Sequence, residues 1–238
     1  MKALLYSDWC VIKSSIKGYV LPALAIMAIA GLTGLDAVEP NALAISSHVH
    51  SVAVSTGIIM LSLFGFFGFF GNDEREGWEG VRLSLPVTRR TVVRSRYVAL
   101  LAWMGVVLIA VNLLGAVAGI VIALVRYGQP AIMPASELLM ANGAILAFAL
   151  LYVAIVTPVF FKMGITKARM YVSLPFLACM LLPLLPGKEA IQAFAHGMSE
   201  SVGAMGPLPL VALALVAGLA CYAASALVSE RIYARRSF

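Results

Sequence analysis

Two groups of residues in this chain have the types that metal binding or acid–base chemistry requires. His48 and His50 stand two positions apart with Glu39 nearby, and three carboxylates follow a long apolar run: Glu74, Glu76 and Glu79. Metal-dependent hydrolysis needs three protein ligands plus an activated water. The three histidines, His196 included, are predicted to lie on the outer side of a membrane, and the glutamates on its cytosolic side. We therefore expect no metal site and no intramembrane protease, and interpret the histidines as solvated loop residues.

Nucleotide chemistry would need a phosphate-binding loop, which the sequence does not contain. No GxxxxGK[ST] pattern, whose backbone N–H groups and lysine hold nucleotide phosphates, occurs in the 238 residues. The three cysteines lack CxxC spacing, so we interpret them as inert apolar side chains: Cys10, Cys179 and Cys221. The chain is therefore predicted to be no enzyme and to hold no cofactor of its own.

The elements that position these residues are predicted to lie in a membrane. Hydrophobic residues make up 62% of the chain and charged residues 12%, against roughly 45–50% and 25% in soluble domains. This predicts an all-α integral membrane protein, with residues 1–238 forming one transmembrane domain. The formal charge of +6 would suit nucleic acid only alongside base-reading or stacking side chains. We interpret it as the mark of the cytosolic membrane surface and expect no nucleic-acid partner.

Six apolar runs without Asp, Glu, Lys or Arg predict six membrane-spanning helices. They cover residues 18–35, 51–71, 97–125, 138–161, 170–185 and 208–229. Before the first run, apolar residues recur at helical spacing over residues 2–17, which predicts an amphipathic helix in the cytosolic interface. A tilted extension of the first span is the alternative for this segment.

Few polar residues interrupt the predicted spans. Asn112 in the third span and Thr157-Pro158 in the fourth are candidates for a cargo pathway or for helix packing. Gly115 and Gly119 favour close approach of a neighbouring helix. No ionisable Asp, Glu, Lys, Arg or His falls within a predicted span, although ion-driven carriers usually hold such groups at mid-membrane. A free-standing secondary carrier is therefore disfavoured.

Lysine and arginine lie almost entirely on one side of these spans. Three precede the first span, six lie in residues 72–97, three separate the fourth and fifth spans, and three follow the sixth, whereas Arg126 and Lys188 lie on the other side. Basic residues accumulate on the cytosolic side of membrane proteins. The chain is thus predicted to be a multi-pass protein of the cell membrane with both termini in the cytosol.

Residues 72–97, NDEREGWEGVRLSLPVTRRTVVRSRY, form the most charged stretch, with six arginines and four carboxylates. Asp73 can cap a short helix over residues 74–85, and Pro86 should end it because the residue before a proline avoids helical geometry. Thr88 can then cap a second helix that enters the third span. This predicts a cytosolic helix, a proline elbow and another helix.

The two halves of this loop suit different partners. Arg94 and Arg96 suit the anionic headgroups of membrane lipids. The carboxylates of the first half would be repelled by such lipids, and Trp78 adds apolar surface there. A mixed-charge, partly apolar helix is therefore interpreted as a docking site for a protein.

Several short segments of the loop form a recognisable pattern: Asn72-Asp73, Gly77-Trp78, LSLPVTR at 83–89, Val92-Val93 and Ser95-Arg96-Tyr97. This pattern resembles the type-2 class of ATP-binding-cassette (ABC) exporter permeases, and the resemblance extends over nearly the whole chain. It implies a dimer of two permease copies or paralogues, each contacting a cytosolic ABC ATPase subunit that binds ATP and magnesium. The loop between the second and third spans would make that contact.

Carried to this sequence, the resemblance implies that residues 74–85 form a coupling helix that transmits closure of the ATPases to the permease. The implied ATPase-coupling residues are Glu74, Arg75, Glu76, Trp78, Glu79, Arg82, Leu83, Pro86, Arg89 and Arg90. Some exporters of this class have a large extracellular domain, but the outer loops here are short. Cargo recognition is therefore expected in the membrane or the dimer interface, and the apolar spans suit export of a lipid, an amphipathic peptide or a hydrophobic drug.

One alternative from another functional class stays open. The chain would then be a non-transporting membrane scaffold or sensor that recruits a cytosolic partner through residues 72–97. Binding of a partner without ATPase activity, together with no cargo movement, would distinguish it from a permease.

Overall fold

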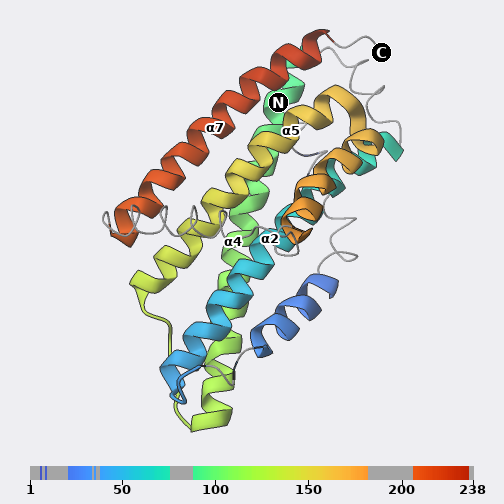
Figure 1. The fold of residues 1–238 in the computed structure, drawn as a ribbon. Helices are drawn as coiled ribbons and strands as arrows, with labels where there is room; N and C mark the ends of the chain where they lie inside the picture. The colour runs from blue at the N-terminus through green and yellow to red at the C-terminus, as the bar shows by residue number, and fades with distance from the viewer. Residues whose placement is uncertain are drawn as a thin grey trace.

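The computed structural model describes residues 6, 9, 21–33, 35, 38–75, 88–181 and 206–235. Every regular element among these residues is helical: a short helix Leu21–Leu32, α2 (Ala42–Arg75), α4 (Arg89–Tyr127), α5 (Ala135–Leu181) and α7 (Pro207–Arg235). α4 packs against α2 and α7, and α5 packs against the same two helices. The result is an elongated bundle of long helices (Figure 1).

Four of these helices are long and apolar enough to cross a membrane: Ala42–Ser62, Arg89–Tyr127, Ala135–Gly164 and Pro207–Arg235. They correspond to the predicted second, third, fourth and sixth spans. The predicted first span, 18–35, contains the shorter apolar helix Leu21–Leu32. The predicted fifth span, 170–185, overlaps the last part of α5. A multi-pass helical membrane protein is confirmed, and the number of six spans stays a prediction.

α4 begins where the sequence predicts. Thr88 has extended backbone geometry (φ −73°, ψ 147°), and its side-chain oxygen accepts a hydrogen bond from the N–H of Thr91 at 3.3 Å. At the other end, Gly128 adopts φ 68° and its N–H donates to the carbonyl of Leu124. At 1.5 Å per residue, the 39 residues extend about 58 Å, well beyond a hydrocarbon layer of about 30 Å. α4 therefore carries its terminal arginines past the apolar layer.

α2 begins earlier and ends later than expected. Asn41 accepts a hydrogen bond from the N–H of Ala44 at 2.7 Å, so the helix starts at Ala42 rather than residue 51. At its far end the helix continues through Asp73 to Arg75, so Asp73 does not begin a new helix. Extending an existing helix is easier than nucleating another. The predicted coupling helix, 74–85, otherwise lies outside the described residues.

The earlier start of α2 overturns the interpretation of two histidines as loop residues. His48 lies on α2, and its Nε2 donates to the carbonyl of Thr33 at 3.0 Å, beside the helix Leu21–Leu32. His50 also lies on α2 and is buried. Hydropathy alone assigns polar residues such as these to a loop, whereas here a neighbouring segment satisfies their hydrogen bonds.

Glycines set the close approach of α4 to α2, as the spacing of Gly115 and Gly119 predicts. A Cβ atom at Gly119 would lie 2.9 Å from the backbone oxygen of Ser46. One at Gly115 would lie 3.0 Å from the ring of His50. The missing side chains therefore let the two helices pack nearly backbone to backbone.

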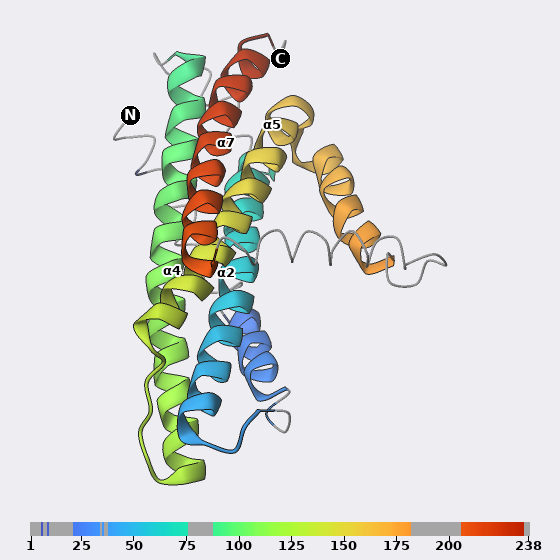
Figure 2. The same ribbon diagram turned by 60° about the vertical axis from the view of Figure 1, so that its left-hand side comes forward.

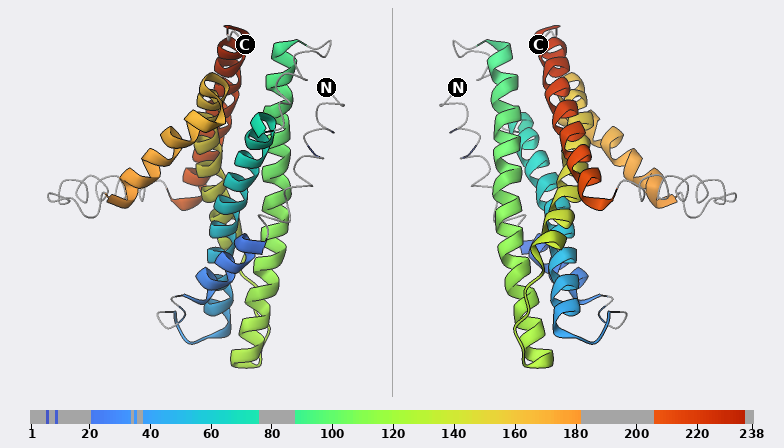
Figure 3. Two further views of the ribbon diagram at one scale, coloured as in Figure 1. Left: turned by 90° about the vertical axis from the view of Figure 1, so that its right-hand side faces the viewer. Right: turned by 90° about the vertical axis from the view of Figure 1, so that its left-hand side faces the viewer.

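One end of the bundle, which we call the arginine end, brings together the start of α4, the bend of α5 and the end of α7 (Figure 1). The bend is at Gly164, where φ of 74° favours glycine. Beyond it, the last part of α5 turns away from the bundle, as two different rotations show (Figures 2 and 3). Arg89, Lys162 and Arg235 share the arginine end, while Arg126 lies at the opposite end.

Aromatic side chains fill the core near the arginine end. Phe66 of α2 packs edge-on against Phe160 of α5, with ring centroids 4.7 Å apart. Arg96 is only 1% exposed, and its guanidinium carbon lies 5.6 Å from the ring centroid of Phe70. The predicted contact of Arg96 with lipid headgroups is therefore wrong, because its place on the helix turns it into the bundle.

Of the predicted interfacial helix over residues 2–17, the structure describes Tyr6 and Trp9, both helical and exposed. The remainder of that segment lies outside the described residues. The interfacial helix stays a prediction.

Candidate functional site

The predicted coupling loop can be followed at its two ends. Glu74 and Arg75 are the last residues of α2, and Arg89 and Arg90 are the first of α4. The other predicted coupling residues lie outside the described part of the chain: Glu76, Trp78, Glu79, Arg82, Leu83 and Pro86. What the structure describes is how the exit of this loop joins the bundle.

Two arginines at this exit attach α4 to the end of α7. Arg89 donates to the backbone carbonyls of Tyr233 at 3.4 Å and Ala234 at 3.1 Å. These carbonyls lie in the last turn of α7, where a helix lacks partners of its own and favours a cation. Arg94 meets both carboxylate oxygens of Glu230 through two of its nitrogens, at 2.6 and 3.4 Å. The start of α4 and the end of α7 are thus cross-linked twice.

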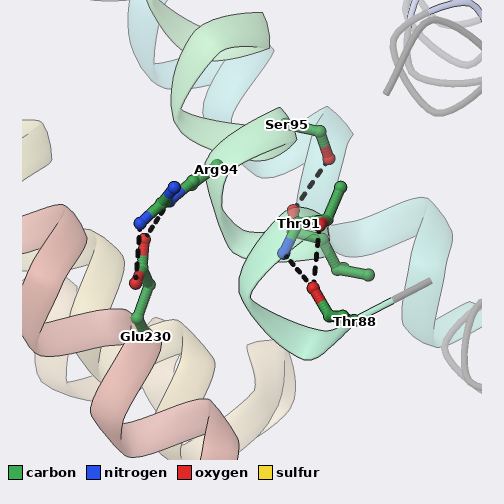
Figure 4. A network of polar contacts seen from close by, with 6 residues as sticks. Thr88, Thr91, Arg94, Ser95 and Glu230 are labelled. Atoms are coloured by element: carbon green, nitrogen blue, oxygen red, sulfur yellow. Dashed lines mark hydrogen bonds and ion pairs between the residues drawn. The ribbon is translucent and has the colours of Figure 1, made fainter.

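Figure 4 shows how local hydrogen bonds support these contacts. The hydroxyl of Thr88 is 2.8 Å from that of Thr91, in addition to the cap on the backbone N–H. One turn later, Ser95 donates to the carbonyl of Val92 at 2.8 Å. The Arg94–Glu230 pair lies on the side of α4 that faces α7 (Figure 4). The first turns of α4 are therefore ordered by their own side chains.

A buried network that we call the tyrosine–serine cluster lies directly below this end and consists of Tyr97, Thr157, Tyr222, Ser225 and Ser229. The Tyr97 hydroxyl lies 2.7 Å from Ser225 Oγ and 2.8 Å from Ser229 Oγ. Tyr222 donates to the backbone carbonyl of Tyr97 at 2.7 Å. α4 and α7 are therefore joined by three further hydrogen bonds.

Pro158 explains where this network ends. Proline has no N–H, so the carbonyl of Ala154, four residues earlier, loses its helical partner. Ser225 of α7 donates to that carbonyl at 2.6 Å, as hydroxyls of neighbouring helices do for prolines in membrane helices. Because the Ser225 hydroxyl donates its hydrogen to this carbonyl, it accepts a hydrogen bond from the Tyr97 hydroxyl. The Tyr97 hydroxyl in turn accepts a hydrogen bond from the Ser229 hydroxyl. The chain of donors thus has one direction.

Thr157 and Pro158, the predicted candidates for a cargo pathway or for helix packing, both contribute to hydrogen bonding inside the bundle. Thr157 is fully buried, and its hydroxyl donates to the carbonyl of Val153 at 2.6 Å. Pro158 frees the carbonyl that Ser225 binds. Of the two interpretations that the sequence leaves open for these residues, the structure favours packing.

A second polar group lies half-way along the predicted third span, and we call it the asparagine cluster: His50, Asn112 and Asn142. The two amides bind each other reciprocally, Asn112 donating at 2.7 Å and Asn142 at 2.9 Å. Each also donates to a carbonyl one turn earlier on its own helix, Leu108 for Asn112 and Leu138 for Asn142, both at 2.8 Å. His50 Nε2 lies 3.3 Å from Asn112 Oδ1.

The geometry determines the orientation of every group in the asparagine cluster. A backbone carbonyl only accepts, so each amide must direct its nitrogen to the carbonyl of its own helix. The oxygen of Asn112 then also only accepts, so Nε2 of His50 is the donor in their contact. Both amides use all their N–H groups, and the cluster closes on itself. For Asn112 this favours helix packing over cargo contact.

His50 corrects one further expectation. It lies within the apolar stretch Ala42–Ser62, so an ionisable residue does occur inside a membrane-spanning helix. The sequence predicted none there because α2 was expected to begin at residue 51. Among the described residues, no group of three His, Cys, Asp or Glu side chains could hold a metal ion.

Some residues of the two polar clusters were not anticipated from the sequence, although it contains signals for them. Tyr222, Ser225 and Ser229 are spaced three and four residues apart, which places them on one face of a helix. A polar face of this kind, together with the carbonyl freed by Pro158, predicts a partner for that carbonyl. Asn142 is a second amide within a span, but nothing local shows that it pairs with Asn112.

Comparison with known proteins agrees with this arrangement of apolar helices. The sequence matches the family described as ABC-2 family transporter protein over residues 3–234. No curated protein and no solved structure matches the chain. Because the family match covers nearly all 238 residues, the chain belongs to the ABC-2 family of transporter proteins, as the resemblance of residues 72–97 implied.

Proposed function

We propose that this chain is the membrane-spanning permease subunit of an ABC exporter. A separate cytosolic ATPase subunit binds ATP and magnesium, and its hydrolysis cycle drives export of a hydrophobic or amphipathic cargo such as a lipid, peptide or drug. Two permeases, either copies or paralogues, form the dimer. Membership of the ABC-2 family supports the permease role, because members of this family are transmembrane components of transporters.

The observation that carries the coupling part of this proposal is the continuity of α4. One helix runs from the cap at Thr88 to Gly128 without a break. Arg89 and Arg94 attach its first turns to the end of α7. A push on the loop that precedes Thr88 would therefore move α4 and α7 together, as a rigid body. A lever of this kind is what an exporter needs between its ATPase and its spans.

The outer surfaces of the bundle support an apolar cargo. α4 exposes a continuous series of large apolar side chains, which includes Leu101, Ile109, Leu113, Val117 and Val125. α7 does the same with Leu208, Leu213, Val216 and Leu219. These faces suit lipid tails, a second permease and an apolar cargo. The proposed cellular location is the cell membrane, with the arginine end and both termini in the cytosol. The distribution of basic residues supports this orientation.

The test is a charge reversal on the proposed coupling helix. Glu76→Arg with Glu79→Arg should abolish recovery of the ATPase subunit when the tagged permease is pulled down from native membranes, because a docking surface of mixed charge is converted to a basic one. Glu137→Arg is the matched control, since Glu137 is exposed at the opposite end of the bundle. The control should retain the ATPase and its stimulated hydrolysis.

Two results would contradict the proposal. Cargo flux in vesicles that contain the permease without any ATPase would show a free-standing carrier. Stable capture of a partner without ATPase activity, together with no flux under any condition, would instead support the scaffold or sensor function.

A further inference from the structure

A hollow of about 380 Å³ lies between the start of α4 and the end of α7 at the arginine end. Its volume falls in the range of roughly 300–1,000 Å³ that is typical of small-ligand sites. Four arginines line it: Arg90, Arg94, Arg231 and Arg235. Glu230 is the acidic residue among its described lining residues, and its carboxylate already binds Arg94. This basic hollow therefore has a large excess of positive charge.

The four arginines are arranged as two facing pairs. Arg90 and Arg94 are four residues apart on α4, and Arg231 and Arg235 are four apart on α7, so each pair lies on one helix face. Guanidinium groups bind phosphate oxygens through two parallel hydrogen bonds. The Arg94–Glu230 and Arg89–Ala234 contacts hold the two walls together. The walls of the basic hollow are therefore held together independently of any ligand, with guanidinium groups on both sides.

On each of the two helices, exposed apolar residues lie within about one turn of the arginines. On α4, Arg94 is followed on the same face by Val98 and Leu101, which are 45% and 44% exposed. On α7, Arg231 is preceded one turn earlier by Leu227, which is 58% exposed and also lines the hollow. The four residues from Arg94 to Val98, or from Leu227 to Arg231, span about 6 Å along the helix axis. A ligand with a phosphate directly above apolar chains matches this pattern on both helices.

We propose that the basic hollow binds the headgroup phosphate of an anionic phospholipid whose acyl chains lie along Val98, Leu101 and Leu227. The arginines alone would also suit a free phosphate or a nucleotide. The apolar step on each wall favours the lipid, because a free phosphate would leave these side chains without a partner. The bound lipid would join α4 to α7 beside their direct cross-links. This proposal does not depend on the coupling to an ATPase.

The experiment is a lipid titration of the purified full-length protein in detergent, followed by native mass spectrometry. Phosphatidylglycerol should bind at one high-affinity site and phosphatidylcholine should not. Arg231→Gln with Arg235→Gln should weaken phosphatidylglycerol binding by about 30-fold. Each arginine near a membrane surface contributes about 1 kcal/mol, so the loss of two corresponds to this factor. Lys162→Gln with Lys167→Gln is the matched control, because these exposed lysines of α5 lie outside the hollow. The control should bind as the wild type does.

Each remaining outcome overturns part or all of the proposal. Equal weakening by both double variants would show a general effect of interfacial charge and no site. Displacement of phosphatidylglycerol by millimolar inorganic phosphate would assign the hollow to a free anion. Loss of lipid when the ATPase subunit binds would assign it to protein docking. If the glutamine variant does not fold, Arg231→Lys with Arg235→Lys replaces it. This variant keeps the charge and should weaken phosphatidylglycerol binding a few-fold, and unchanged binding would contradict the proposed role of the guanidinium groups.

Discussion

The asparagine cluster joins α2, α4 and α5 through side chains that bind one another, whereas the tyrosine–serine cluster joins α4, α5 and α7 through a chain of hydroxyls that ends on a backbone carbonyl. Both lie among apolar side chains. The asparagine cluster does not replace a missing backbone hydrogen bond. The second exists because Pro158 leaves a carbonyl without a partner.

This difference indicates different roles for the two clusters. The asparagine cluster specifies which faces of three helices meet, because its amides are oriented by their own helices and can pair in only one register. The tyrosine–serine cluster continues into the cross-links of Arg89 and Arg94 and therefore connects the loop that precedes α4 with α7. One cluster fixes the packing of the helices, and the other lies where motion is expected to enter.

The largest expected effect is on the asparagine cluster. Asn112→Leu should lower the free energy of unfolding by about 2 kcal/mol, because the amide of Asn142 and the N–H of His50 lose their partner inside the bundle. Unfolding in mixed micelles with increasing dodecyl sulfate measures this loss. In the Asn112→Leu background, Asn142→Leu should lower the free energy of unfolding by about 1 kcal/mol less than it does in the wild type. Additive losses would show that the amides do not interact.

The next effect tests the role assigned to Pro158. Ser225→Ala should lower the unfolding free energy by about 1.5 kcal/mol, since it leaves the carbonyl of Ala154 without a donor. In a Pro158→Ala background, the restored N–H satisfies that carbonyl, and the loss should fall by about 1 kcal/mol. The same micelle titration measures the cycle. An unchanged loss in that background would separate Ser225 from the proline.

A smaller effect is expected where α4 begins. Thr88→Val keeps the shape of the side chain but removes the cap on the N–H of Thr91, which should cost about 1 kcal/mol. Hydrogen exchange at the first turn of α4 should rise, while the asparagine cluster stays protected. Thr88→Ser keeps the hydroxyl and serves as the control. Equal exchange in all three proteins would mean that the cap does not order this turn.

The smallest effect is expected from Glu230→Gln. The side chain of Arg94 is 59% exposed, so solvent screens its pairing with Glu230. We expect a slight fall in melting temperature at low salt, which disappears at high salt because ions screen the remaining interaction. A large fall that salt does not alter would show that the pair acts as a buried one.

Much of the fold follows from local properties of the sequence. Apolar length predicts the long helices, Thr88 predicts the start of α4, and the spacing of Gly115 and Gly119 predicts a close helix contact. The start of α2 was misplaced because hydropathy treats His48 and His50 as loop residues. Arg96 was assigned to lipid because its charge suggests exposure, whereas it lies under the ring of Phe70. In each error a polar side chain that looks exposed in the sequence contacts a neighbouring part of the bundle.

By itself, the sequence determined that this chain is a helical membrane protein, where basic residues gather and that it belongs to the ABC-2 family, because length, composition and motif are properties of the chain alone. Only the tertiary structure decided that Asn112 pairs with Asn142, that Ser225 donates to the carbonyl freed by Pro158, and that Arg89 and Arg94 bind α7. Hydrogen bonds act over about 3 Å. Which residues come that close depends on how whole helices pack.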